Sequence, residues 1–202
     1  MSFLSDYTEK NSNLIPKIDI PCFAWNSQAE QGLLFFKAKS LDTNDFYDLI
    51  EWSKSGGYQG SVILFFDFES GKVFKPFAKK RNVIYSNPVY AEGFYYFLQG
   101  DYDEKKISLY RYIPGKLLEK ETELSTEEVS LSNLCIIGNP VHIISQEDTF
   151  VCYYPEKISF PITGHESALF IEDEKIYFES WVEEGRKRKN DRRKRDPRHG
   201  IL

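Results

Sequence analysis

The sequence predicts an all-β protein, and three observations support this class. Short runs rich in β-branched and aromatic residues recur along the chain, turn residues separate them, and helical periodicity is scarce. With sixteen Phe, thirteen Tyr and a hydrophobic fraction of 41%, the 202 residues can bury a proper core. We expect one all-β domain over residues 32–184, preceded by an N-terminal extension (residues 1–31) and followed by a basic, disordered tail (residues 185–202).

One segment has helical periodicity, residues 43–54. Phe46, Leu49 and Ile50 recur there at helical spacing, behind polar residues at 42–43 that can cap the N-terminus. We therefore expect one short helix inserted into the β fold.

Turn residues divide the rest of the domain into strands. The polar loop at 69–72 joins two β-rich runs into a predicted hairpin, and residues 99–104 do the same for a second hairpin. In the second hairpin, Ile107 and Leu109 alternate with polar residues, which indicates a half-buried strand. The expected strands are residues 32–39, 61–68, 73–77, 94–98, 107–113, 116–124, 135–137, 141–144, 150–154, 157–162, 168–171 and 175–181.

Two similar segments indicate an internal repeat. Residues 86–90 (Ser-Asn-Pro-Val-Tyr) and 138–142 (Gly-Asn-Pro-Val-His) are fifty-two positions apart, and each precedes β-rich runs. On these motifs, residues 32–181 resemble the β-propeller repeats of the TolB and WD40 kind. The resemblance implies a propeller-like fold, or a partial propeller of about four blades at roughly 45 residues a blade. The Trp-Asp and Gly-His signatures of WD40 blades are absent, and a twisted β-sandwich is the alternative.

The charge of the chain divides at Gly185. The last eighteen residues carry nine Lys/Arg against two Asp, whereas the preceding 184 carry seventeen Lys/Arg against twenty-nine Asp/Glu. Because Lys/Arg runs neutralise phosphates and release counterions, the tail is a candidate site for nucleic acid or another polyanion. A solvated end, docking on the acidic body or a non-native terminus would explain the same charges. The candidate residues are Arg186, Lys187, Arg188, Lys189, Arg192, Arg193, Lys194 and Arg195.

Large aromatic residues are candidates for a ligand surface. Trp25, Trp52 and Trp181 could bind a peptide or a sugar, although in β proteins such rings more often cover a sheet. Tyr58 belongs to the glycine-rich stretch 53–60, which could adapt to a ligand but lacks the Gly-Lys-Ser/Thr ending of a phosphate-binding loop.

The sequence contains no assembled catalytic or metal-binding motif. The three histidines are scattered, and His142, which alternates with apolar neighbours, is expected on the outer face of a strand. Ser167 is displaced by one position from the nucleophile elbow pattern. We expect no cofactor, no metal and no catalytic residue that the sequence can single out.

The cysteines and the N-terminus predict the compartment. Cys22, Cys135 and Cys152 are odd in number and have no CxxC spacing, which favours reduced thiols. The chain has no basic stretch followed by an apolar one at its start, and its longest apolar runs are too short to cross a bilayer. We expect a soluble cytoplasmic protein without membrane contact, or a nuclear one if the basic run acts in a eukaryotic cell.

Three functions are compatible with these features. The first is a non-enzymatic intracellular interaction module that binds a protein or peptide. The second is a nucleic-acid or polyanion binder that acts through the tail. The third is a carbohydrate-active enzyme whose carboxylates the sequence cannot identify.

Overall fold

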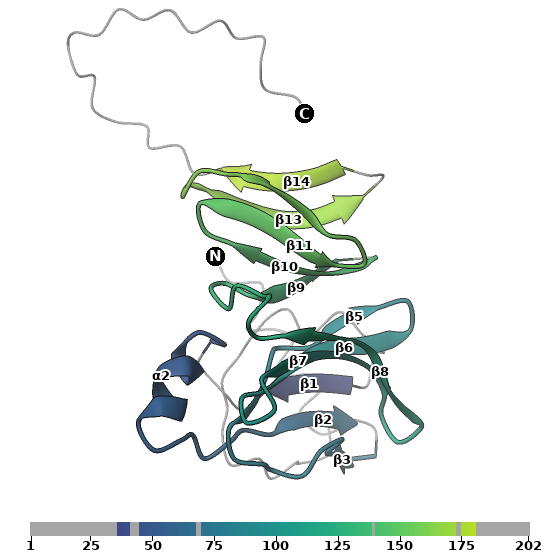
Figure 1. Ribbon diagram of the computed structural model, residues 1–202. Helices are drawn as coiled ribbons and strands as arrows, with labels where there is room; N and C mark the ends of the chain where they lie inside the picture. Colours follow the sequence, from purple (N-terminus) through teal and green to yellow (C-terminus); the bar gives the residue numbers. More distant parts are fainter. Residues whose placement is uncertain (1–35, 41–44, 68–69, 139, 173–174, 181–202) are drawn as a thin grey trace, which may run out of the picture.

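The computed structural model describes residues 36–40, 45–67, 70–138, 140–172 and 175–180. Fourteen strands and one short α-helix lie in this part of the chain, which confirms the all-β class (Figure 1). The predicted N-terminal extension and basic tail lie outside it.

The strands form four antiparallel sheets, which we name A to D in chain order. Sheet A contains β1 (Phe36–Ser40), β2 (Ile63–Asp67) and β3 (Val73–Phe74). Sheet B contains β4 (Val83–Tyr85), β5 (Val89–Ala91), β6 (Phe94–Asp101), β7 (Lys106–Ile113) and β8 (Leu117–Ser125). Sheet C contains β9 (Cys135–Gly138), β10 (Val141–Gln146), β11 (Thr149–Tyr154) and β12 (Ile158–Pro161). Sheet D is the hairpin of β13 (Glu166–Glu172) and β14 (Lys175–Ser180).

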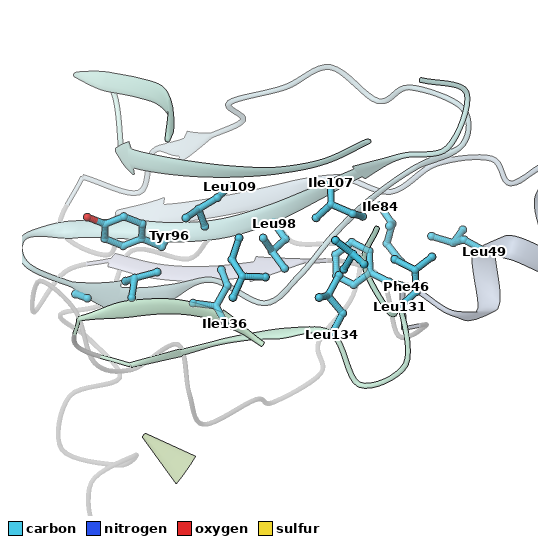
Figure 2. Packing of buried hydrophobic residues seen from close by; sticks show 14 residues of the cluster. Phe46, Leu49, Ile84, Tyr96, Leu98, Ile107, Leu109, Leu131, Leu134 and Ile136 are labelled. Atoms are coloured by element: carbon cyan, nitrogen blue, oxygen red, sulfur yellow. The ribbon is translucent and has the colours of Figure 1, made fainter. Parts of the chain in front are cut away.

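The four sheets are held together by three apolar clusters, each between sheets that are consecutive in the sequence. The A–B cluster is built by Ile63, Phe65, Val83, Tyr85, Tyr95, Phe97 and Tyr112. The B–C cluster joins the other face of sheet B to β9 and β10, with Tyr96, Leu98, Ile107, Leu109, Ile136 and Ile143 among its residues (Figure 2). The C–D cluster contains Ile137, Ile144, Phe150, Cys152 and Ile171, with Phe160 and Phe178 packed against it.

The central strands of sheet B, β6 and β7, are therefore covered on both faces, so the prediction of a half-buried strand at 107–113 was wrong. Along β6, Tyr95 and Phe97 point into the A–B cluster, whereas Tyr96 and Leu98 point into the B–C cluster. The predicted face of β7 is real, because Ile107 and Leu109 are fully buried. Its opposite face is buried too, because sheet A packs against it.

The predicted helix is present as α2 (Asp48–Lys54), shorter than the predicted 43–54. The carboxylate of Asp45 accepts hydrogen bonds from the backbone N–H groups of Tyr47 (2.8 Å) and Asp48 (3.1 Å), which satisfies donors that the first turn leaves free. Phe46 and Leu49 are buried beside sheet B, as predicted from their spacing (Figure 2).

The Asn-Pro repeat does not mark equivalent positions in the two sheets. In sheet B, residues 86–88 separate β4 from β5, which pair with opposite ends of the same strand, β6. In sheet C, Pro140 of the second Asn-Pro directly precedes β10, next to the point where Gly138 of β9 pairs with Val141 of β10. The described strands form no closed propeller ring.

Candidate functional site

The hairpin of sheet D packs one face on sheet C, and in the described part of the chain its other face is exposed. Ala168, Ile176 and Phe178 lie on the inner face, in the C–D cluster. The ring of Phe178 meets the rings of Phe150 and Phe160 edge-on, at centroid distances of 5.7 and 5.9 Å. These contacts fix the hairpin against sheet C and decide which side chains face outward.

The outer face of sheet D carries exposed apolar side chains. Phe170 and Tyr177 are opposite each other in the β13–β14 register, and their rings stack with a centroid distance of 4.4 Å and an interplanar angle of 20°. Both side chains are 40% exposed, and neighbouring Leu169 is 50% exposed. We call Leu169, Phe170 and Tyr177 the outer aromatic face.

A bulge in β13 creates this surface. The pairing register shifts between Ala168 and Phe170, so that Leu169 is an extra residue on its strand. Strict alternation would place only every second residue outward, whereas here Leu169 and Phe170 are both exposed and Ile171 is buried. The sequence analysis did not identify this site. Leu169, Phe170 and Ile171 are three consecutive apolar residues in β13. Since neighbouring residues of a strand face opposite sides of the sheet, such a run indicates that at least one of them lies outside the core.

The two sequence-predicted aromatic candidates that the structure describes lie together at the end of α2. The rings of Trp52 and Tyr58 are in contact, with a centroid distance of 5.0 Å and a 39° tilt. Trp52 is 36% exposed, and Tyr58 packs against the B–C cluster. Trp25 and Trp181 lie outside the described residues, as do all eight basic candidates of the tail.

The glycine-rich stretch around Tyr58 has a structural explanation. The side chain of Arg81 donates a hydrogen bond to the carbonyl of Gly56. Gly60 has a φ of +81°, and a Cβ there would overlap the Lys80 carbonyl oxygen. The stretch is thus a close-packed junction with the segment before β4, and it gives no support to the prediction of an adaptable binding loop.

A polar cleft of about 370 Å³ lies where sheets C and D meet. Some of its polar groups are already hydrogen-bonded: Gln146 Oε1 accepts from the backbone N–H of Ala168 at 2.8 Å, and the Gln146 carbonyl accepts from Asn133 Nδ2 at 2.9 Å. Glu166 Oε2 accepts from the backbone N–H and the hydroxyl of Thr163, at 2.7 and 2.9 Å, and these bonds lower the pKa of Glu166. The lining residues are Asn133, Gln146, Glu147, Asp148, Gly164, Glu166 and Ser167.

Comparisons with family models, with curated proteins and with solved structures found no match.

His142 and Cys152 are buried, and Cys135 is partly buried. His142 was predicted on an outer face, but it is buried on the side of β10 that sheet D covers, with Nδ1 2.8 Å from the Pro140 carbonyl oxygen. Burial raises the pKa of Cys135 to about 11 and also raises the pKa of Cys152.

Within the described residues, no three His, Cys, Asp or Glu side chains are grouped to hold a metal ion. The same part of the chain contains no helix long and apolar enough to cross a bilayer.

Proposed function

We propose that this protein is a non-catalytic interaction module that binds a protein partner through the outer aromatic face of sheet D. The observation that carries the proposal is the stacked, exposed pair of Phe170 and Tyr177. Aromatic residues are enriched in the centres of protein interfaces because they bury a large area at a small cost in side-chain entropy. The module works without a cofactor, and we place it inside the cell, away from membranes.

The packing of the molecule itself indicates what such a face can bind. Aromatic contacts join neighbouring sheets in the interior: Phe65 meets Tyr112 across the A–B cluster at 4.7 Å, and Phe150 meets Phe178 across the C–D cluster at 5.7 Å. The outer aromatic face has the composition of these inner faces but is open to solvent in the described residues. Another protein surface could cover it in the same way, since aromatic pairs contribute about 0.5–1.5 kcal/mol beyond their buried area.

Site-directed photocrosslinking in cells of the source organism tests this function. Placing benzoylphenylalanine at Leu169 leaves Phe170 and Tyr177 intact, and the same probe at Val73 is the matched control. Val73 is 41% exposed on sheet A, far in the sequence from sheet D. We expect a discrete adduct from position 169 that is lost with Phe170→Ser and Tyr177→Ser together. Adducts that form equally from both positions, or that survive the two substitutions, would contradict the proposal.

The basic tail supports a second candidate function, the binding of nucleic acid or another polyanion. Its support is the density of Lys and Arg after Gly185, in contrast to the acidic remainder of the chain. The two functions use different segments, so they can be tested independently.

Glu166 of the polar cleft gives no support to the third candidate, a carbohydrate-active enzyme. A glycosidase needs a carboxylic acid whose pKa is raised so that it can donate a proton. The hydrogen bonds from Thr163 have the opposite effect on Glu166, because they stabilise its ionised form.

We also propose that the four sheets are consecutive blades of a partial propeller. In sheet C the strand order β9-β10-β11-β12 is the chain order, and in sheet B the broken strand β4/β5 is followed in order by β6, β7 and β8. Strands that complete one sheet before the next begins are typical of propellers, whereas the two sheets of a Greek-key sandwich exchange strands repeatedly. An experimental structure whose sheets exchange strands would contradict this arrangement.

A further inference from the structure

The polar cleft between sheets C and D is acidic. Glu147, Asp148 and Glu166 line it, and no Lys or Arg is among the described residues that do so. Between residues 135 and 180 the sequence has two Lys and no Arg, and Lys157 and Lys175 lie at the ends of their hairpins that are remote from the cleft. Within the described residues, none of the three carboxylates forms an ion pair. The cleft therefore has negative charges that no described cation balances.

The placement of these carboxylates suits an extended cation better than a single ion. Glu147 and Asp148 belong to the turn between β10 and β11, whereas Glu166 begins β13, so the acidic groups come from two sheets and line a cleft of about 370 Å³. In the described part of the chain, no three of the possible ligand side chains are close enough together to hold a metal ion. A peptide with several Lys and Arg residues can meet separated carboxylates, because each carboxylate then receives its own cation.

The chain itself leaves sheet D beside this cleft. In the β13–β14 register, Ser180 pairs with Glu166 and Glu179 pairs with Ser167, and both Glu166 and Ser167 line the cleft. Opposite residues of an antiparallel pair are about 4.5–5.5 Å apart, so the last described strand ends at the wall of the cleft. Residues 186–189 (Arg-Lys-Arg-Lys) begin six positions after Ser180. Six residues span at most about 20 Å, so these four cations are tethered close to the carboxylates.

We propose that the cleft binds the basic segment 186–195 of its own chain. A short flexible linker holds a tethered ligand at an effective concentration in roughly the millimolar range, so even a weak site is occupied within one chain. Docking engages the same Lys and Arg side chains that would neutralise phosphates, and it therefore competes with a polyanion for the tail. The contact uses a surface and a segment that the proposed binding of a protein partner does not use.

Photocrosslinking within the full-length chain tests this contact. Benzoylphenylalanine replaces Asn190, which lies between the two basic runs, so all eight Lys and Arg residues of 186–195 stay in place. At about 1 μM protein and physiological ionic strength, we expect an intramolecular adduct that mass spectrometry maps to residues 133, 146–148 or 164–167. Raising the salt to about 1 M shortens the screening length to about 3 Å and should lower the adduct yield at least fivefold.

Two exposed glutamates in turns of sheet C provide a matched pair of variants. Glu147 lines the cleft, whereas Glu156 lies in the turn between β11 and β12, at the opposite end of β11. Glu147→Lys puts a cation among the acidic groups and should lower the adduct yield about threefold, whereas Glu156→Lys should leave it unchanged. Circular dichroism of both variants confirms that the sheets are still folded.

The inference is overturned by a chain without the adduct, by an adduct that maps elsewhere, or by one that forms only at twice the chain mass. It is also overturned if the adduct persists at high salt or if the two charge reversals have equal effects. None of these results bears on the outer aromatic face, which the probe at position 169 tests separately.

Discussion

Asn82 and Tyr58 are joined by a reciprocal pair of hydrogen bonds. The backbone N–H of Tyr58 donates to Asn82 Oδ1 at 2.8 Å, and the backbone N–H of Asn82 donates to the Tyr58 carbonyl at 2.9 Å. The Asn82 side chain also donates from Nδ2 to Asp103 at 2.8 Å. One buried residue therefore fixes both the loop after α2 and the tip of the β6–β7 hairpin.

Replacing Asn82 tests this junction. Asn82 has a φ of +58°, a left-handed conformation that Asn tolerates better than Ala, and its amide satisfies two hydrogen-bond partners. We expect Asn82→Ala to lower the free energy of unfolding by about 2–3 kcal/mol, measured by urea denaturation. Asn87→Ala, at an exposed position, should stay within about 0.5 kcal/mol of the wild type. Equal effects of the two substitutions would contradict the role assigned to Asn82.

Two glycines form a matched pair for separating steric overlap from backbone strain. Gly60 and Gly93 have similar φ values, +81° and +87°, but a Cβ at Gly60 would overlap the Lys80 carbonyl, whereas a Cβ at Gly93 meets nothing within 4 Å. Gly93→Ala should therefore cost about 1 kcal/mol, from the conformation alone, and Gly60→Ala should cost at least about 2 kcal/mol more. Thermal and urea unfolding of both variants measure the difference, and a smaller loss at Gly60 than at Gly93 would show that the junction can relax.

The stability of the protein should depend on the ionisation of Cys135 at high pH. Burial raises the pKa of this thiol from 9.0 to about 11, so between these values the unfolded chain has already lost a proton that the folded chain retains. Stability therefore falls as the pH rises through this window. The difference in unfolding free energy between the wild type and Cys135→Ala is expected to shrink by about 2 kcal/mol between about pH 8 and pH 10.5.

A substitution without a thiol provides the control for this pH dependence. Ile136→Val removes a methylene from the neighbouring buried position in β9, and its difference from the wild type should stay constant over the same range. If Cys135→Ala and Ile136→Val behave alike with pH, the thiol is not protected from ionisation by burial.

Removal of the tail tests polyanion binding. The full chain is expected to bind duplex DNA or RNA with an affinity that falls by roughly 10³-fold between about 50 and 200 mM salt, if about six phosphates are neutralised. Deletion of residues 185–202 should abolish this binding. Replacement of the eight Lys and Arg residues of 186–195 by Gln keeps the chain length and should abolish it equally. Binding that is flat with salt, or unchanged in both variants, would exclude the tail as a polyanion site.

The sequence predicted most strands because their apolar runs are bounded by clear turn residues. Both hairpins around 69–72 and 99–104 are present, and so is the helix that Phe46 and Leu49 indicated. β4 and β5 were missed because each has only three residues, too few to establish a period of two. Burial was underestimated in β7, because alternation within one strand cannot show that a second sheet covers its other face.

The candidate site was less predictable than the fold. Trp52 and Tyr58 were chosen for residue type, and the structure brings them into contact. The outer aromatic face, in contrast, depends on the bulge at Leu169, which changes which side of β13 the following residues occupy. A bulge is a property of the pairing between two strands, so one strand's composition does not reveal it.

The succession of the three clusters has a consequence for how the protein is made. Each cluster joins sheets that follow one another in the sequence, so in the described residues every core is completed by the segment that is synthesised next. Apart from the contacts of Phe46 and Leu49 in the B–C cluster, such contacts close short loops and favour fast, stepwise folding as the chain leaves the ribosome. The central strands of sheet B, β6 and β7, are enclosed on both faces and should then exchange their amide hydrogens most slowly, and the terminal sheets A and D should open first.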